Sequence, residues 1–358
     1  MKWLCIVLVW PIFLSGQDLS TSELTESRQT RYGSVLSQND LYQPFLRSDK
    51  YFTNGISAEY ADQFLYNGIA KRLLVNLLKK GKSEYAISFS QDMYTPENQN
   101  LYQVDSTDIP YSGLLYLTYT RHSNDIKKGS KFISKLYLGV QGPAAGAGEV
   151  QNWVHKYVSD DPSVRGWQHQ IGNGLILDYQ MIHMKMLPVR ARHVEISTMA
   201  VARVGTLFNY AQLGLSMKLG WFNYSFLNFD GLFNVFSKKG SYELEDIRWS
   251  QKRKGNARLA KKPRTVFVNR DFQIYTHLRY LAEYMFYDGT VQGSLIPFEE
   301  SPYLYSGKEL EHFSGNFAFG ITMNYRRFSI QYERVTRRDV FKGEGLFGWG
   351  NIRVMASF

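Results

Sequence analysis

Gln151 and His155 are the two residues whose types and spacing point most directly to chemistry. They lie in 144–159, a segment with the composition of a short helix that follows a glycine-rich turn. A spacing of four residues puts both side chains on one face of a helix. A neutral imidazole with a polar neighbour is able to act as a general base. Asp161 follows six residues after His155 and adds a carboxylate in the next turn or loop.

Asn39 and Asp40 form a second polar pair, at the end of the first candidate strand. Their side-chain oxygens are hard ligands, which suit calcium better than zinc. A Ca²⁺ ion at this place would polarise an ester carbonyl and stabilise an oxyanion. Both signals have ordinary alternatives, because a lone histidine on a loop helix is most often a surface residue and Asn-Asp at a strand end is most often a turn. These residues alone therefore leave the reaction open.

Other catalytic signatures are absent from the sequence. The remaining histidines form no close pair of the His-x-x-x-His kind, so no zinc site is indicated. There is no Gly-x-Ser-x-Gly elbow and no glycine motif for phosphates or dinucleotides. Cys5 is the only cysteine and lies near the N-terminus, which leaves a processed chain without a disulfide or a thiol nucleophile.

The N-terminus has the layout of a secretory signal peptide. A short basic start is followed by an apolar run over 4–14 and by small residues at Ser15 and Gly16. The run is too short for a membrane-spanning helix, which needs about 20 apolar residues. We expect residues 1–16 to be a signal peptide and 17–358 to form a single outer-membrane β-barrel domain.

The net charge of +10 and the pI near 9.3 indicate an acidic partner or a solvated basic surface. Export from the cytoplasm argues against nucleic acid. A phosphate-rich membrane surface such as lipopolysaccharide is the better partner.

Alternation with a period of two residues recurs along the chain, most clearly over 85–90, 115–120 and 212–219. A soluble antiparallel sheet gives the same pattern. The candidate strands are long, however, and the chain ends on the aromatic residue Phe358, as many outer-membrane barrels do. The sequence therefore predicts an all-β fold, a twelve-stranded antiparallel transmembrane β-barrel with a short helix in an extracellular loop. The predicted strands are 31–39, 51–60, 83–92, 112–122, 131–141, 171–183, 191–205, 208–220, 271–285, 314–326, 328–340 and 348–358.

This strand count determines where the polar residues meet. If the N-terminus lies in the periplasm, Asn39-Asp40, the start of the second strand near Thr53 and the 144–159 helix all reach the outer rim. The long connection 221–270 then falls on the periplasmic side, where loops are normally short. Either a hairpin has been missed there or the insert is unusual.

An ordered set of short stretches resembles one known family, the outer-membrane lipid A 3′-O-deacylases. The matching stretches are Gln38-Asn39-Asp40, Tyr51-Phe52-Thr53-Asn54-Gly55, Gln91-Asp92-Met93-Tyr94-Thr95-Pro96, Asp108-Ile109-Pro110-Tyr111-Ser112-Gly113, Leu138-Gly139-Val140-Gln141-Gly142-Pro143, Glu149-Val150-Gln151 with His155, and Gly166-Trp167-Gln168 with Gln170. The resemblance runs from about 31 to 180, and only the barrel character continues to 358.

The resemblance implies a calcium-dependent site between the barrel wall and an extracellular helix, where a histidine activates water to release the 3′ acyl group of lipid A. His155 looks like the base, and Asn39 and Asp40 look like part of the calcium site. Thr53 and Gln151 match polar active-site positions.

Two positions depart from the family pattern. Asp161 stands where the family carries a glutamate, and Gly172 where related sequences often have an acidic residue.

We expect an outer-membrane esterase acting on lipid A in the outer leaflet, inserted with the help of the barrel assembly machinery. Arg47, Lys50 and Arg165 are candidates for holding the glucosamine phosphates. The alternatives are a phospholipase acting on glycerophospholipids and a non-catalytic barrel or pore.

Overall fold

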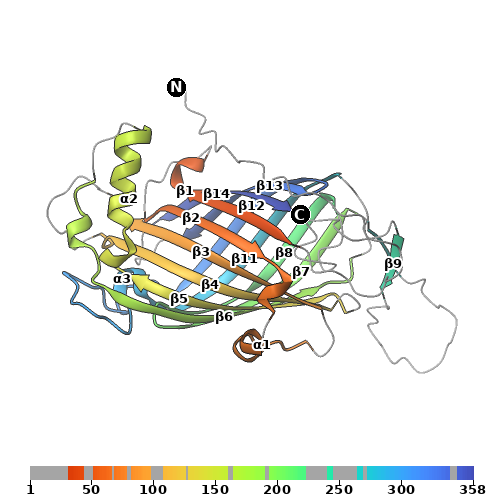
Figure 1. Cartoon of the computed structure of the whole chain (residues 1–358), viewed down its shortest axis with the longest axis horizontal. Coiled ribbons are helices and arrows are strands. Elements are labelled where there is room, and N and C mark those ends of the chain that lie inside the picture. The colour runs from red at the N-terminus through yellow and green to blue at the C-terminus, as the bar shows by residue number, and fades with distance from the viewer. Residues whose placement is uncertain are drawn as a thin grey trace.

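In the computed structural model, the protein folds into a closed antiparallel barrel of twelve strands (Figure 1). The structure describes residues 31–43, 51–66, 68–78, 82–97, 108–125, 128–159, 164–189, 193–222, 240–244, 264–268, 272–338 and 345–358. The barrel strands are β1 (Tyr32–Asn39), β2 (Tyr51–Ala61), β3 (Lys82–Thr95), β4 (Ser112–Asp125), β5 (Ser130–Gln141), β6 (Gly174–Met186), β7 (Val194–Gly205), β8 (Phe208–Trp221), β11 (Phe272–Asp288), β12 (Phe313–Tyr325), β13 (Phe328–Arg338) and β14 (Leu346–Ser357). Consecutive strands of this set pair with one another, β8 with β11 included, and β1 closes the barrel against β14.

All twelve predicted strands are present, so the predicted fold class is confirmed. The strand ends differ most at β3, β4, β6 and β11, each of which runs three residues beyond the predicted end, while β6 and β7 begin three residues after the predicted start. These extra residues are held by pairing with the next strand, as Tyr94 is with Ser112, and their own sequence does not alternate. The predicted signal peptide lies outside the described residues.

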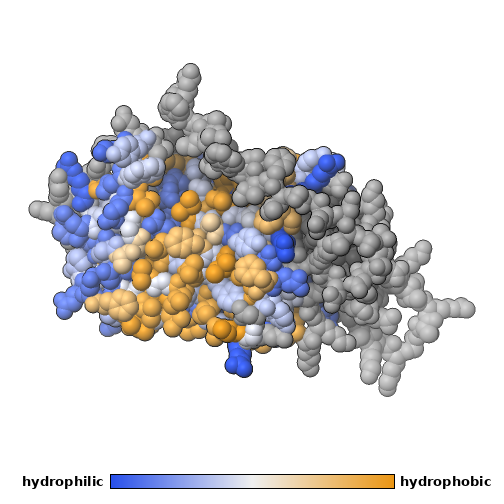
Figure 2. All heavy atoms as spheres, in the orientation of Figure 1, coloured by the Kyte–Doolittle hydropathy of each residue, from blue (hydrophilic) through white to orange (hydrophobic). Residues whose placement is uncertain are grey.

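The outer wall carries a belt of exposed apolar side chains, visible as the orange band in Figure 2. The belt follows from the alternation, because every second residue of a strand points away from the lumen. Such a belt suits a wall that faces lipid. Its members include Val35, Ile56, Phe89, Leu117, Leu138, Leu177, Val204, Leu213, Leu215, Phe317, Phe319, Ile330 and Val354.

The two ends of the barrel carry different elements. We call the outer end the one with helices α2 (Ala147–Val154) and α3 (Gly289–Gln292). The inner end is where the Phe358 amide donates to the Arg31 carbonyl at 3.1 Å. At that end β9 (Gly240–Leu244) pairs with β10 (Arg264–Val268) in a two-stranded sheet separate from the barrel. The 221–270 connection thus contains a strand pair, but the pair adds nothing to the barrel.

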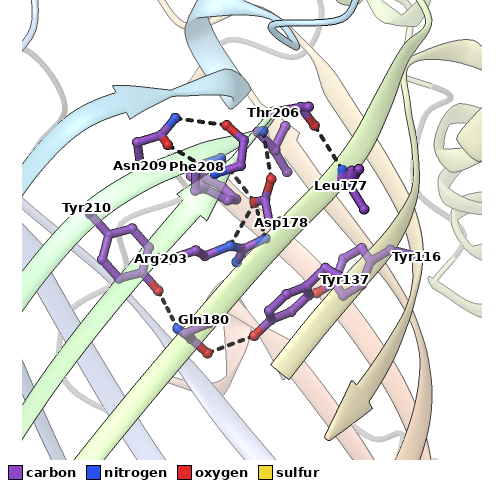
Figure 3. A network of polar contacts seen from close by, with 12 residues as sticks. Tyr116, Tyr137, Leu177, Asp178, Gln180, Arg203, Thr206, Phe208, Asn209 and Tyr210 are labelled. Atoms are coloured by element: carbon purple, nitrogen blue, oxygen red, sulfur yellow. Dashed lines mark hydrogen bonds and ion pairs between the residues drawn. The ribbon is translucent and has the colours of Figure 1, made fainter. Parts of the chain in front are cut away.

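The outer half of the lumen is filled by a layer of interlocked polar side chains (Figure 3). Arg203 forms an ion pair with Asp178 at 2.7 Å and stacks on the rings of Tyr137 and Phe208. Gln180 accepts a hydrogen bond from Tyr137 Oη, and the Gln180 amide donates to Tyr210 Oη. We call these residues the Arg203 layer.

The inner half of the lumen is hollow. A cavity of about 310 Å³ lies there, lined by charged residues of strands on opposite sides of the barrel, among them Glu59, Lys131, Lys135, Glu195, Lys218, His277, Arg279, Glu333 and Arg353. An apolar cluster of Tyr32, Tyr275 and Met355, packed against Phe222, lies at its inner end. Within the described residues, no helix has the length and apolar character needed to cross a membrane.

Candidate active site

The predicted polar pair of β1 lies at the outer rim of the barrel, as expected. Asn39 ends β1 opposite Asn54 of β2 and Gly350 of β14. Its Oδ1 accepts a hydrogen bond from the Leu41 amide at 2.8 Å, which starts the 3₁₀ turn Asp40–Tyr42. Asn39 therefore acts as a cap, the ordinary use of this residue type.

Asp40 places a buried carboxylate inside this turn, only 5 % exposed. The turn is fixed to the neighbouring strands β14 and β13. Gln43 donates from Nε2 to the carbonyls of Asp40 and Gly348, and Tyr332 Oη donates to the Tyr42 carbonyl at 2.8 Å. A buried charge held on a rigid turn is costly unless something compensates it, which makes Asp40 a strong candidate for a functional role.

Thr53 lies at an irregularity of the sheet. The register of β2 against β3 shifts between Phe52 and Asn54, so Thr53 is the extra residue of a bulge. Tyr51, two residues before it, has a φ of 71°, a conformation that bulky residues rarely adopt. The Thr53 hydroxyl shares a hydrogen bond with that of Thr95. Bulges next to active sites commonly change the direction of a side chain, and this bulge changes the direction of Thr53 at the rim.

Helix α2 is docked firmly on the outer ends of β3 and β4. Gln91 of β3 donates from Nε2 to the Ala145 carbonyl at 2.7 Å, just before the helix. The Gly142 amide donates to the Gly113 carbonyl at 2.8 Å. A Cβ on Gly113 would lie 2.6 Å from that of Ala147, so the helix can approach the wall this closely only at a glycine.

Gln151 faces the barrel from α2 and is buried. Its Oε1 accepts a hydrogen bond from Trp167 Nε1 at 2.6 Å. The Trp167 ring packs on Tyr111 with ring centroids 5.1 Å apart. A Cβ on Gly148 would lie 2.8 Å from the Trp167 ring, so the indole and the helix fit closely. Burial raises the pKa of Tyr111, which keeps this phenol neutral.

His155 lies one helical turn beyond Gln151. It caps α2 with its backbone amide and begins the π-helical turn His155–Ser159. Single π-helical turns occur frequently at functional sites. The side chain is partly exposed, whereas Gln151 is buried. The predicted helix is therefore confirmed, with the imidazole at the edge of the packed region.

The structure thus brings five of the predicted residues to one end of the barrel: Asn39, Asp40, Thr53, Gln151 and His155. The sixth, Asp161, lies outside the described residues, as do Arg47 and Lys50. Arg165 is described and exposed.

Gly172 has a structural reason to lack a side chain. A Cβ there would lie 2.7 Å from the Glu300 carbonyl oxygen. The neighbouring Asn173 donates from Nδ2 to the Glu299 carboxylate at 2.9 Å. A carboxylate from another loop therefore lies beside the position at which the family resemblance implied an acidic residue.

Asp92 is a polar residue for which no role was predicted. Its Oδ2 accepts a hydrogen bond from Tyr116 Oη at 2.7 Å, and its Oδ1 lies close to Gly55, where a Cβ would be 2.8 Å away. Gln38 lies against the same glycine. The alternation of β3 puts Asp92 on the lumen face, but only the tight contact at Gly55 reveals that it packs under the site.

The metal prediction rests on donor chemistry. Among the described residues, no three His, Cys, Asp or Glu side chains are grouped closely enough to hold a metal ion. Calcium, however, also accepts amide and backbone oxygens and water. The buried carboxylate of Asp40 and the amide oxygen of Asn39 fit a hard cation of this kind.

Comparisons with known proteins agree with the barrel fold. The family described as "Outer membrane protein LpxR" matches residues 3–358. The solved structure of LpxR from Salmonella typhimurium aligns with a TM-score of 0.65 and 17 % identity, covering 91 % of this chain and all of that one. The autotransporter β domain of Bordetella BrkA and a channel from Pseudomonas putida F1 align over 93 % and 95 % of this chain and all of theirs, at 8 % and 11 % identity. Their TM-scores are only 0.40 and 0.36. The search of curated proteins gave no match.

Proposed function

The chain belongs to the LpxR family of outer membrane proteins, and from that premise we propose that it is a calcium-dependent lipid A 3′-O-deacylase. The observation that carries the proposal is the docking of α2. It holds Gln151 and His155 at the rim where Asn39, Asp40 and the bulged Thr53 also lie. A site at this level faces the outer leaflet, where the acyl chains of lipid A are.

His155 is the proposed general base. Its imidazole takes a proton from water, and the hydroxide attacks the carbonyl carbon of the ester at the 3′ position. The bond between the carbonyl carbon and the sugar oxygen then breaks, and the protonated imidazole returns its proton to the departing sugar oxygen. The products are a free fatty acid and a lipid A with a 3′ hydroxyl. General acid–base catalysis of this kind contributes a factor of roughly 10²–10⁴ to the rate.

The other residues position the reaction. Gln151, fixed by Trp167, keeps the face of α2 toward the barrel and so orients His155. Asn39 and Asp40 would supply side-chain oxygens to a calcium ion, which when bound would stabilise negative charge on the ester oxygen. The Thr53 hydroxyl is a polar contact for the substrate at the same rim.

The test is mass spectrometry of lipid A from cells that lack other lipopolysaccharide-modifying enzymes, with and without this protein. The reaction is repeated in vitro with Ca²⁺ or EDTA. Loss of one 3′ acyl group, only with calcium and only with His155 intact, is the expected result.

Two results would redirect the proposal. Fatty-acid release from phosphatidylethanolamine but not from lipid A would indicate a phospholipase. An unchanged lipid A spectrum together with ion conductance that is independent of metal would indicate a non-catalytic barrel.

A further inference from the structure

The connection between β2 and β3 lies against the outside of the barrel wall at the inner end. It contains the 3₁₀ turn Gln63–Leu65 and the short helix α1 (Gly68–Leu73), described over 63–66 and 68–78. Leu74 has no exposed surface and packs on Tyr85 of β3. Figure 1 shows α1 outside the strands, below β6 in this view.

The wall residues under this connection point away from the lumen. Tyr85 belongs to the same outward column of β3 as Ile87 and Phe89, both exposed members of the apolar belt. Tyr119 pairs with Ile87 and belongs to the corresponding column of β4. Successive outward residues of a strand lie about 7 Å apart, so the connection starts one step below the belt.

Specific bonds hold the connection in place. Tyr119 Oη donates to the Leu65 carbonyl, and the Val75 amide donates to Tyr179 Oη at 2.8 Å. Arg121 donates from Nη1 to the Leu74 carbonyl at 2.9 Å. These bonds satisfy backbone groups that would otherwise be exposed at the edge of the belt. The connection is therefore a built part of the wall.

Its other face is apolar and exposed. Phe64 is 69 % exposed, and Ile69 and Leu77 are each 66 % exposed. Leu73 and Val75 are exposed as well, and so is Arg72, which precedes Leu73 in the sequence. Several large apolar side chains exposed on one short segment mark an interaction surface, because their contact with water is unfavourable.

We propose that this connection is an interfacial anchor that inserts Phe64, Ile69 and Leu77 into the inner phospholipid leaflet of the outer membrane. The argument for lipid as the occupant is continuity, since the connection packs on Tyr85, one outward position from the exposed belt residues Ile87 and Phe89 of the same strand. Arg72 would meet the phosphates of the headgroups. The anchor is independent of any chemistry at the outer end.

Single labelled cysteines test the proposal in a Cys5→Ser background, in which no other cysteine remains. Ile69→Cys and Leu77→Cys are each labelled with an environment-sensitive fluorophore. Each variant is reconstituted into nanodiscs of phosphatidylethanolamine and phosphatidylglycerol, with one barrel per disc. Leu213→Cys on the belt of β8 is the lipid control, and Glu309→Cys in an exposed loop is the water control. The change in gel mobility between unheated and heated samples shows whether each variant is folded.

The expected result is strong quenching of Ile69→Cys and Leu77→Cys by lipids with a nitroxide near the headgroup. This quenching should be as strong as for Leu213→Cys and several-fold stronger than for Glu309→Cys. Weak quenching by lipid nitroxides together with strong quenching by aqueous iodide would overturn the proposal. That second result would assign the apolar face to a periplasmic protein partner instead.

Discussion

The two halves of the lumen differ in how their buried charged side chains are surrounded. In the outer half, the Asp178 carboxylate is fully buried, accepts from the Leu207 and Phe208 amides and pairs with Arg203. In the inner half, the Glu333 carboxylate bonds His277 and Arg279 but borders a cavity of about 310 Å³. A cavity of this size with a polar lining is able to hold water.

This difference indicates that the two halves contribute differently to the site at the rim. The outer half is packed around the Arg203–Asp178 ion pair, so it gives a rigid base for the rim that carries His155 and Asp40. The inner half is hollow and charged, and none of the proposed site residues lies there. Changes in the outer half should therefore affect activity or stability strongly, and equivalent changes in the inner half weakly.

Substitution of one histidine in each half gives the largest expected difference in the deacylation rate. His155→Ala should lower the rate of 3′ deacylation on the order of a thousandfold, because it removes the general base. His277→Gln in the inner cavity should leave the rate close to that of the wild type. Single-turnover kinetics on purified lipid A measures both. A folded and fully active His155→Ala barrel would refute the assignment of the base.

Removal of one buried charge in each half is the next test. Asp178→Asn should lower the free energy of unfolding by about 3 kcal/mol, because it leaves Arg203 buried without its counter-charge. Urea titration in lipid vesicles measures this loss. An effect no larger than that of a surface substitution would show that water reaches the Arg203 layer.

The docking of α2 can be loosened without touching a polar group. Gly148→Val forces a side chain into the Trp167 ring, moves Gln151 and His155, and should lower the deacylation rate about 100-fold, since small displacements of reacting groups cost this much. Gly345→Val is the matched control, because nothing lies within 4 Å of the Cβ position at Gly345. Equal activity of the two variants would mean that α2 need not be held rigidly.

The smallest expected effect comes from the inner half. Glu333→Gln should lower the free energy of unfolding by about 1 kcal/mol, because water in the cavity can solvate Arg279 and His277. The same urea titration compares it with Asp178→Asn. A loss as large as that of Asp178→Asn would contradict the contrast between a dry outer layer and a wet inner cavity.

The strand pattern was readable from the sequence because a period of two residues assigns each side chain to a face of the wall. It predicted twelve strands and so the placement of Asn39, Thr53 and His155 at one rim. It could not show where a strand stops once it is held by its neighbour, as β3 is by β4. Nor could it show that the strands of 221–270 pair outside the barrel.

Features that depend on contacts between distant residues appeared only in the folded chain. The bulge at Thr53 exists because β2 and β3 shift register, and alternation along one strand cannot reveal a shift between two. Tyr85 and Phe89 look alike in sequence as outward aromatic residues, yet only Tyr85 is covered by Leu74. The sequence by itself determined the fold and the residue types at the rim, since local periodicity encodes both. Tertiary structure alone decided which polar groups are buried, paired or covered, because burial depends on what folds over them.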